Sequence, residues 1–490
     1  MSIHKKLSRR DALKLGAAAV GSSVAAPLAA AQGRPAQGQK DNRPNFVIFM
    51  TDGQRPDELS YMVGKEASVL GWDQNPGICK LLKTPSLDRI ASEGAWIKNA
   101  FVVNALCAPG RAATLTGLYS RSNGVIDNKD RPLAEGVKII SDYLHEAGYE
   151  VAFCGKAHIK DALRNHYWDY YFGYYFEPNL NARIAEGYYG HVGPDREYQG
   201  YLDDFVTDAA IGWLQGKRQK PFCLFVWFKE PHGEGIRQRR YQNLYNGVFV
   251  PKPETFDDDL KGYPDKSKAV ADADDKLGNF EYCASLEQIV KNHNTGVVEA
   301  DGYIGRVMKI LEETGKLDDT VIMNTADHGY FLGEWHLIDK RFMYEPSIRI
   351  PLGIRYPKLI KPGTMIDEMV LNIDIAPTVL DLAGVKIPSR MQGRSIVPLI
   401  RGNNAGWRKD WLYSYYEYPG SNMVPKSHGV RTERYKIIEY YEERPTEWEL
   451  YDLQEDPHEL HNLYGDPRYS ELTERLKKRL NELRKETGES

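Results

Sequence analysis

Cysteine is scarce in this chain. Its 490 residues include only five, none closely spaced and none in the Cys-x-x-Cys pattern of metal sites: Cys79, Cys107, Cys154, Cys223 and Cys283. We therefore expect no disulfide framework. Cys154 and Cys223 lie inside apolar runs and are predicted to be buried thiols. Cys107 instead lies beside proline, glycine and arginine, an unusual place for a cysteine that serves only packing.

The chain also lacks an excess of charge of one sign and, after residue 31, a long apolar segment. The formal net charge is −4, so there is no basic footprint for a nucleic-acid partner. No later stretch approaches the roughly 20 apolar residues of a membrane span, so we do not expect an integral membrane protein. With 42% hydrophobic residues, the chain is long enough for a large core and about two to three domains.

The N-terminus has the pattern of an export signal. Basic residues precede an alanine-rich apolar run that ends at Ala31 in small residues suited to cleavage. The segment Ser8–Lys14 resembles a twin-arginine signal, although Ala12 stands where that pattern usually has Phe. We predict a twin-arginine-type signal peptide over residues 1–31, a polar linker over 32–43, and export by the twin-arginine machinery to the periplasm or the exterior. An amphipathic terminal helix is the alternative.

Four nearly continuous apolar runs are predicted strands, and polar residues follow each of them. The runs are Asn45–Met50, Glu150–Cys154, Phe222–Phe228 and Thr320–Asn324. Such runs are typical of strands buried on both faces. Helical patterns separate them, which predicts an α/β fold with a large, mostly parallel sheet sandwiched by helices. Because parallel strands end at one edge of a sheet, we expect the polar residues after the four runs to meet there.

The character of the chain changes after about residue 402. Four short strand candidates and a charged helix follow, over residues 411–418, 428–432, 435–441, 448–452 and 469–487. We therefore predict a main α/β domain over residues 44–402 and a smaller C-terminal subdomain, an antiparallel sheet with a helix, over 403–490.

Two further segments have two interpretations each. The polar segment 236–282 is either a solvated insertion or a substrate-facing lid. The aromatic run from His166 to Tyr175 either lines a sugar-sized pocket or packs in the core.

The residues that follow the strands suit a divalent metal and an anionic substrate. Asp52, Asp327 and His328 supply two carboxylates and an imidazole, a mainly oxygen ligand set that favours Ca²⁺ or Mg²⁺. Two lysines could neutralise an anionic group, and two histidines could move protons: Lys156, Lys340, His158 and His232. A single Asp or His in such a place is more often a capping or packing residue, so the hypothesis depends on their joint appearance.

The stretch around Cys107 favours a reactive role for its side chain. Pro109 is tolerated in the first turn of a helix and Gly117 would end it, so Cys107 is predicted at a helix N-terminus. Backbone N–H groups there favour negative charge. Gly110 removes bulk, and Arg111 places a permanent positive charge one turn away. This arrangement suits a nucleophile that acts on an anionic substrate.

The pattern Cys-x-Pro-x-Arg at residues 107–111, followed by Leu-Thr-Gly, resembles the signature of the sulfatases of the alkaline phosphatase superfamily. The resemblance implies that a formylglycine-generating maturation enzyme oxidises Cys107 to formylglycine (3-oxoalanine), whose hydrated aldehyde is the nucleophile. It also implies an alkaline-phosphatase-like catalytic domain. The implied metal is Ca²⁺, or alternatively Mg²⁺ or Mn²⁺, held by Asp52, Cys107, Asp327 and His328.

Other motifs extend the resemblance from about residue 45 to about residue 457. The segment Gly155-Lys156-Ala157-His158 looks like a family segment whose Lys contacts sulfate and whose His helps to break down the sulfated intermediate. His232 matches the His placed near the leaving oxygen, and Lys340 matches the second sulfate-binding Lys. In this comparison Arg111 and the metal hold the hydrated aldehyde.

Two positions depart from the family pattern. Gly53 stands where the family usually has a second Asp, or Gln in some branches, and it has no side chain to bind a metal. Either Gln54 or water would take that place, with weaker metal affinity or a shifted metal preference as the consequence. Trp335 replaces a common His, which suggests altered substrate recognition.

We therefore expect an exported sulfatase that hydrolyses the sulfate ester of a small molecule or, more specifically, a saccharide. One alternative is a phosphonate monoester or phosphodiester hydrolase of the same superfamily, which relative rates on aryl sulfate and phosphonate esters would reveal. The other is a non-enzymatic binding protein on this fold, for which Cys107→Ala would cause no loss of activity.

Overall fold

The computed structural model describes residues 41–62, 81–129, 131–159, 163–175, 178, 180–232, 238–253, 255–256, 270, 285–420, 423–442 and 445–489. The predicted signal peptide and most of the predicted linker lie outside the described residues, as does most of the segment 236–282. Three of the five cysteines are described, and all three are buried free thiols: Cys107, Cys154 and Cys223.

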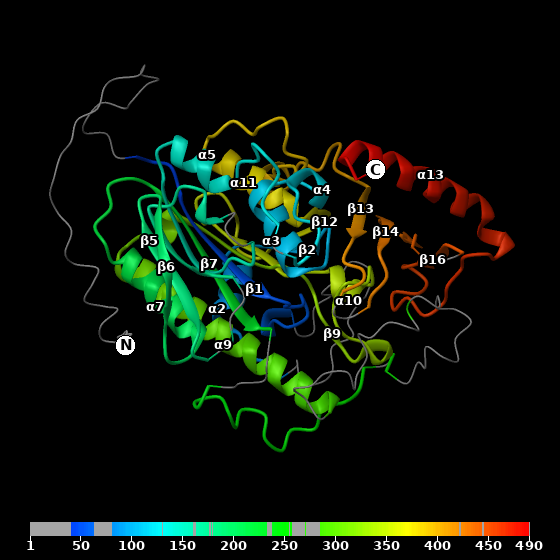
Figure 1. Cartoon of the computed structure of the whole chain (residues 1–490), viewed down its shortest axis with the longest axis horizontal. Coiled ribbons are helices and arrows are strands. Elements are labelled where there is room, and N and C mark those ends of the chain that lie inside the picture. Colours follow the sequence, from blue (N-terminus) through cyan, green and yellow to red (C-terminus); the bar gives the residue numbers. More distant parts are fainter. Residues whose placement is uncertain are drawn as a thin grey trace, which may run out of the picture.

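A ten-stranded sheet forms the centre of the molecule (Figure 1), in the order β12-β2-β11-β8-β1-β7-β3-β4-β5-β6. Its strands are β1 (Asn45–Asp52), β2 (Ala95–Phe101), β3 (Glu150–Lys156), β4 (Tyr170–Tyr174), β5 (Arg183–Tyr188), β6 (His191–Glu197), β7 (Phe222–Pro231), β8 (Thr320–Ala326), β11 (Leu352–Arg355) and β12 (Thr364–Leu371). The four predicted runs form β1, β3, β7 and β8, which are neighbours in parallel register. β11 is antiparallel to both of its neighbours, and the β5–β6 hairpin adds an antiparallel edge beside β4. The predicted α/β fold class is confirmed.

Helices cover both faces of this sheet. The described α-helices are α2 (Pro85–Ser92), α3 (Cys107–Thr116), α4 (Ser120–Asn123), α5 (Ile140–Glu146), α7 (Leu202–Leu214), α9 (Leu286–Glu313), α10 (Glu345–Ile348), α11 (Ile375–Leu382), α12 (Val397–Ile400) and α13 (Ser470–Thr487). Short 3₁₀ turns are η2 (Ser60–Met62), η4 (Leu317–Asp319), η5 (Glu334–His336), η6 (Asn372–Asp374) and η7 (Pro467–Tyr469). None of the described helices is both long enough and apolar enough to cross a bilayer.

The central strand β1 is held by a hydrophobic layer on each face. Phe46, Ile48 and Met50 pack in the cluster that α3, α5 and α11 cover. Val47 and Phe49 point to the other face, where they pack with α2, α7 and α9 (Figure 1). Full burial of each such side chain contributes roughly 1.5–3 kcal/mol. The position of the polar residues at the end of β1 is therefore fixed from both sides.

A second, four-stranded antiparallel sheet and the long helix α13 form the C-terminal part. The sheet order is β13-β14-β15-β16, with β13 (Asp410–Tyr415), β14 (Ser427–Thr432), β15 (Tyr435–Tyr440) and β16 (Glu447–Asp452). This agrees with the predicted architecture, while the division of the chain at residue 402 stays a prediction.

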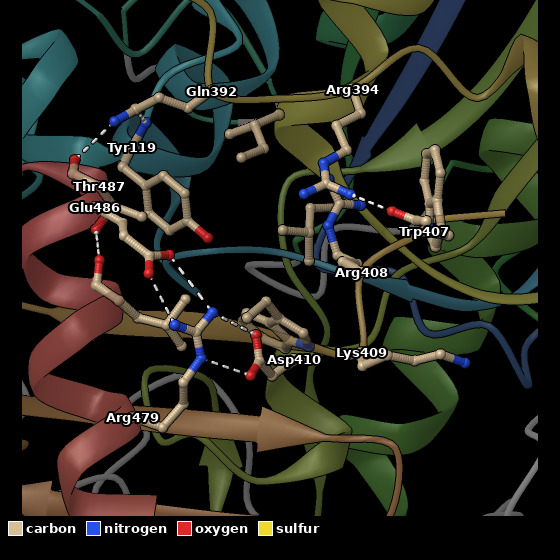
Figure 2. Close-up of a pocket in the computed structure, with 15 residues that line it drawn as sticks. Tyr119, Gln392, Arg394, Trp407, Arg408, Lys409, Asp410, Arg479, Glu486 and Thr487 are labelled. Atoms are coloured by element: carbon tan, nitrogen blue, oxygen red, sulfur yellow. Dashed lines mark hydrogen bonds and ion pairs between the residues drawn. The ribbon is translucent and has the colours of Figure 1, made fainter. Parts of the chain in front are cut away.

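Helix α13 meets the main body around a cavity of about 520 Å³ (Figure 2). Arg479 of α13 pairs with Asp410 at 2.7 Å and with Glu486 at 2.8 Å. Gln392 donates an amide N–H to the carbonyl oxygen of Thr487 at 2.7 Å. Polar contacts within the protein therefore use most of the hydrogen-bonding groups on this wall of the cavity.

A buried ion cluster joins the two sheets. Glu345 of α10 accepts contacts from Lys436 at 2.9 Å, from Arg349 at 3.2 Å and from Arg431 at 3.4 Å. Lys436 and Arg431 belong to the C-terminal sheet, whereas Arg349 belongs to the main body. Burial alone would raise the pKa of Glu345, but Arg431, Lys436 and Arg349 hold it well below its usual range. The carboxylate therefore stays charged and holds cations from both parts of the chain.

We predict that Glu345→Gln destabilises the protein by about 3–5 kcal/mol, because Arg349 and Arg431 lose a buried counter-charge and Lys436 is left with its ion pair to Glu459 at 2.6 Å. Thermal unfolding followed by circular dichroism would show a fall in Tm of several degrees. The matched control is Glu433→Gln, which removes the exposed partner of Lys409, an ion pair of 2.6 Å. It should cost less than about 1 kcal/mol. Equal shifts in the two variants would contradict the structural role given to Glu345.

Candidate active site

Four potential metal ligands converge at the carboxyl edge of the main sheet. Asp52 ends β1, Asp327 and His328 directly follow β8, and Cys107 begins α3. One ligand atom from each residue lies within 4.8 Å of every other, and all four residues are buried. β1 and β8 are register neighbours up to Thr51 and Ala326, so the residues that follow these strands must lie side by side. Two carboxylates, an imidazole and the side chain of residue 107 form a donor set that fits a divalent cation.

Helix α3 places Cys107 against this cluster. All ten residues of the helix are buried, and the helix ends at Gly117 in the left-handed conformation. The Cys107 Sγ lies 3.4 Å from the Nε2 of His328 and 3.7 Å from an oxygen of Asp52. A Cβ on Gly110 would come within 2.3 Å of the backbone oxygen of Asp327. The glycine is therefore required for the helix to pack directly against the metal-ligand loop.

Arg111 connects both carboxylates of the cluster. Its Nε donates to Asp327 at 2.9 Å and its Nη2 donates to Asp52 at 3.1 Å. Its remaining Nη1 donates to the backbone oxygen of Lys156 at 2.8 Å. The Lys156 ammonium also pairs with Asp52. Because charge-assisted bonds of this kind fix both distance and plane, Arg111 sets the orientation of the two carboxylates.

The cluster has an unusual distribution of charge. Burial raises the pKa of Asp52, but Lys156, the hydrogen bond from His328 and Arg111 outweigh it and hold this pKa well below its usual range. Burial and the charge of Asp52 together raise the pKa of Asp327. For Cys107, burial and Asp52 raise the pKa, but Lys156, Lys340 and His328 outweigh them and bring it to about 6. The surroundings of residue 107 therefore favour a negative group.

A strained loop delivers Lys340 to the same edge. The strands β9 (Phe331–Leu332) and β10 (Ile338–Asp339) flank η5, and four non-glycine residues of the loop have positive φ: Trp335, His336, Asp339 and Arg341. Left-handed backbone at such residues costs on the order of 1 kcal/mol each and is concentrated at functional sites. The Lys340 Nζ lies 2.9 Å from Asp339. Its effect on the pKa of Cys107 places its charge near residue 107.

His158 and His232 lie at the ends of β3 and β7. Pro231, the neighbour of His232, is the register partner of Asp52. Burial, followed by the charge of Lys156, lowers the pKa of His158 well below its usual range. Burial, followed by Lys340, does the same to the pKa of His232. Both imidazoles are therefore neutral at neutral pH.

The two departures from the family pattern have structural explanations. Gly53 has φ +84°, and a Cβ there would meet the Cε1 of His328 and a ring carbon of Tyr330 at 3.1 Å each. The imidazole of His328 thus takes the space that a side chain at residue 53 would need. Gln54 accepts a hydrogen bond from the hydroxyl of Thr51 at 2.9 Å. Trp335 is fully buried against Phe331 and Tyr344, so its ring packs in the core, and the suggested effect on substrate recognition stays a prediction.

The sequence analysis missed the partners that hold the Lys340 loop. Arg55, three residues after Asp52, pairs at 2.6 Å with Glu334 of η5. Glu334 in turn accepts the backbone N–H of Leu332 at 2.7 Å. Asp339, the partner of Lys340, was not singled out either. The position of Asp339 next to Lys340 was the only sequence signal that could have identified it as a partner. Nothing in the sequence indicates that residues 55 and 334 form an ion pair.

The chain matches two family models. The model described as Sulfatase matches residues 44–385, more than half of the chain, and the model described as N-sulphoglucosamine sulphohydrolase, C-terminal, matches residues 333–486. An N-acetylglucosamine-6-O-sulfatase of Bacteroides thetaiotaomicron is 32% identical and covers 92% of this chain and 88% of its own length. An N-acetylglucosamine-6-sulfatase of Homo sapiens is 30% identical, with 76% of this chain and 67% of that protein covered.

A solved structure described as a complex with its substrate D-glucosamine-2-N,6-O-disulfate is also similar to this chain. Its TM-score is 0.80 at 30% sequence identity, and it covers 91% of this chain and 99% of its own. The similarity therefore includes both the ten-stranded sheet and the C-terminal part.

We predict that Gly53→Ala lowers both metal affinity and kcat/KM by about 10-fold or more, because the new methyl displaces His328. The matched control is Gly136→Ala, whose φ is +70° but whose Cβ would have no heavy atom within 4 Å. Both variants carry the left-handed backbone cost, roughly 1 kcal/mol, which thermal unfolding measures. Equal activity in the two variants would show that the contact between residue 53 and His328 does not matter.

Proposed function

The chain belongs to the sulfatase family, and we propose that this sulfuric ester hydrolase removes the 6-O-sulfate of a glucosamine residue. The two relatives named above are both 6-sulfatases of N-acetylglucosamine. The similar solved structure holds a substrate that also carries sulfate on the 6-oxygen of glucosamine. The observation that carries the proposal is the convergence of Asp52, Asp327, His328 and Cys107 on one buried point.

In this proposal Asp52, Asp327 and His328, together with the side chain of residue 107, hold a divalent cation. Two carboxylate donors favour a hard ion, which we propose to be Ca²⁺, with Mg²⁺ or Mn²⁺ as alternatives. Such an ion, when bound, supplies positive charge next to the oxygens of the sulfate group. Gly53 contributes no ligand. The Nδ1 of His328 lies 2.7 Å from the backbone oxygen of Gly329, so an Nδ1–H donates there and Nε2 is left to face the cluster.

We propose that a formylglycine-generating maturation enzyme converts Cys107 to formylglycine. The hydrated aldehyde of this group supplies the hydroxyl that attacks sulfur. Arg111 orients that group indirectly, through its bonds to Asp52 and Asp327. The N-terminus of α3 and the cations that lower the pKa of Cys107 favour negative charge at this side chain.

The remaining site residues bind the sulfate and move protons. We propose that Lys156 and Lys340 contact the sulfate oxygens and offset their charge. His158, neutral because burial and Lys156 lower its pKa, is suited to accept the proton of the second hydroxyl on residue 107 at an imidazole nitrogen, after which the sulfate leaves and the aldehyde is restored. We propose that the proton for the leaving oxygen of the sugar comes from His232 or from the Lys340 ammonium, and the lowered pKa of His232 favours Lys340. Burial opposes the charge of Lys340, but Asp339 outweighs it and raises this pKa, which keeps the ammonium protonated.

The proposed setting of the enzyme follows from its N-terminus. We propose that residues 1–31 are a twin-arginine-type signal peptide, followed by a linker over 32–43, and that the enzyme works in the periplasm or outside the cell. The catalytic domain then comprises residues 44–402 and the C-terminal subdomain residues 403–490.

Mass spectrometry of the peptide that contains residue 107 tests the nucleophile. We expect an aldehyde in place of the thiol in protein made with the maturation enzyme. Cys107→Ala should lower kcat by on the order of 10³-fold or more, because the nucleophile is removed. Cys154→Ala, which changes a buried thiol within β3, is the control and should keep the activity per folded molecule. An unmodified thiol in fully active enzyme would overturn this assignment.

Rates on paired substrates test the proposed specificity. We expect kcat/KM for N-acetylglucosamine 6-sulfate to exceed that for the 3-sulfate isomer by about 100-fold, because a site built around one hydroxyl position rejects another. A phosphonate monoester measured in parallel should react more slowly than the 6-sulfate. Faster cleavage of the phosphonate would favour the phosphonate hydrolase alternative.

A further inference from the structure

A second cleft lies on the part of the molecule opposite the catalytic edge. It has a volume of about 660 Å³ and is lined mainly by residues of β4, β5 and α7, whose places in the fold are shown in Figure 1. Glu150, the first residue of β3, lines this cleft, whereas Lys156, the last residue of β3, belongs to the active site. Seven residues of strand separate the two places by about 20 Å. We call this space the aromatic cleft.

Seven aromatic residues line the aromatic cleft: Tyr170, Phe172, Tyr188, Tyr189, Tyr198, Phe205 and Trp213. Tyr188 and Tyr189 remain 45% and 69% exposed, so packing in the core does not account for them. Flat rings at the rim of a cleft of this volume provide faces on which a sugar ring can stack. The volume is enough for more than one sugar ring.

Tyr189 is held in a backbone conformation that disfavours it. It has φ +50° and Gly190 has φ +80°, in the two-residue turn between β5 and β6. Asn or Gly is preferred at such a position, and a bulky residue costs roughly 1–2 kcal/mol there. Two backbone hydrogen bonds hold this turn. The N–H of Tyr189 donates to the backbone oxygen of Asp169 at 3.2 Å, and the N–H of Gly190 donates to the backbone oxygen of Trp168 at 2.9 Å. The fold thus retains a strained, exposed ring at the rim.

The carboxylates of the aromatic cleft already have protein partners. Glu186 accepts the hydroxyls of Tyr188 at 3.0 Å and Tyr170 at 3.3 Å. Asp208 pairs with Arg306 at 2.5 Å. Asp169 accepts the backbone N–H of Val151 at 2.8 Å. Arg306 offsets the charge of Asp208, and the hydrogen bonds to Glu186 and Asp169 satisfy acceptor atoms of these two carboxylates.

The cations at one end of the cleft are not neutralised in the same way. Lys217 and Lys220 are exposed, and no carboxylate in the described part of the chain forms an ion pair with either of them. Arg218, between them, has a side chain that is only 7% exposed, and its carboxylate partner Glu150 lies 3.5 Å away. The Arg218 guanidinium also donates to the backbone oxygen of Trp213 and lies over the Trp213 ring. An anionic group bound at this end of the cleft would meet the two exposed ammonium groups of Lys217 and Lys220.

We propose that the aromatic cleft is a second, non-catalytic saccharide-binding site that takes an anionic sugar segment. Sugar rings stack on Tyr188 and Tyr189, and a sulfate or carboxylate group of the same segment contacts Lys217 and Lys220. The cavity in Figure 2 differs from the aromatic cleft in the pairing of its cations. Its cation Arg479 is already paired with Asp410 (Figure 2), and its cation Arg408 is paired with Asp374.

Binding of three tetrasaccharides to the full-length protein tests this proposal. The probes are a heparin-derived tetrasaccharide, its desulfated form that keeps the carboxylates, and the neutral chitotetraose. We expect the heparin probe to slow hydrogen exchange over residues 183–198 and 212–220, whereas the neutral probe gives weaker protection. Protection by the desulfated form as well would assign the contact to carboxylates, and protection by the sulfated form alone would assign it to sulfate. Equal protection by all three, or none, would overturn the proposal.

Variants separate a binding role from a structural one. Lys217→Gln with Lys220→Gln should weaken heparin tetrasaccharide binding by about 5- to 10-fold, measured by calorimetry. Tyr189→Gly should weaken it while leaving Tm unchanged or higher, because the turn strain is relieved. Lys358→Gln with Lys409→Gln, which changes two exposed lysines outside the cleft, is the charge-matched control. All variants should keep kcat/KM on a sulfated monosaccharide. Unchanged tetrasaccharide affinity in both cleft variants would refute the proposal.

Discussion

The active site depends on one guanidinium group. Arg111 is buried and donates to Asp52, to Asp327 and to the backbone oxygen of Lys156. Without it, two buried carboxylates would repel one another, and the ends of β1, β3 and β8 would lose the group that holds them together. Its position one turn after Cys107 means that the same helix supplies the residue proposed as nucleophile and the residue that orders the metal ligands. For this reason Cys107 and Arg111 must lie close together in the sequence, although the other residues of the site come from distant segments.

Much of this arrangement could be predicted because it follows from simple patterns. Strands buried on both faces form continuous apolar runs, and parallel topology then requires their carboxyl ends to meet. The strands around the site, and the polar residues that follow them, were identified on that basis. The helix that starts at Cys107 could be predicted from Pro109 and Gly117. These signals are short in range and need no knowledge of which segments pack together.

Other parts could not be predicted, for physical reasons. β11 has four residues and its direction is set by its neighbours. β6 is largely exposed, so it has no apolar alternation. The polar N-terminal half of α9 contains buried His293 and Asn294, which hides its inner face from any hydrophobic pattern. The pair Arg55–Glu334 and the contact of Gly53 with His328 join segments almost 280 residues apart. Such pairs exist only once the fold is known.

The complete burial of α3 has a consequence for the order of events in the life of the protein. Cys107 is 1% exposed, and its helix lies between the metal-ligand loop and the hydrophobic layer under α5 and α11. A second enzyme could not reach this thiol in the finished fold, because the side chain is buried against Asp52, His328 and the rest of its own helix. Any enzymatic conversion of Cys107 must therefore act on the nascent or unfolded chain. Folding then competes with the conversion of Cys107. A chain that folds before this conversion keeps the thiol and lacks the proposed nucleophile.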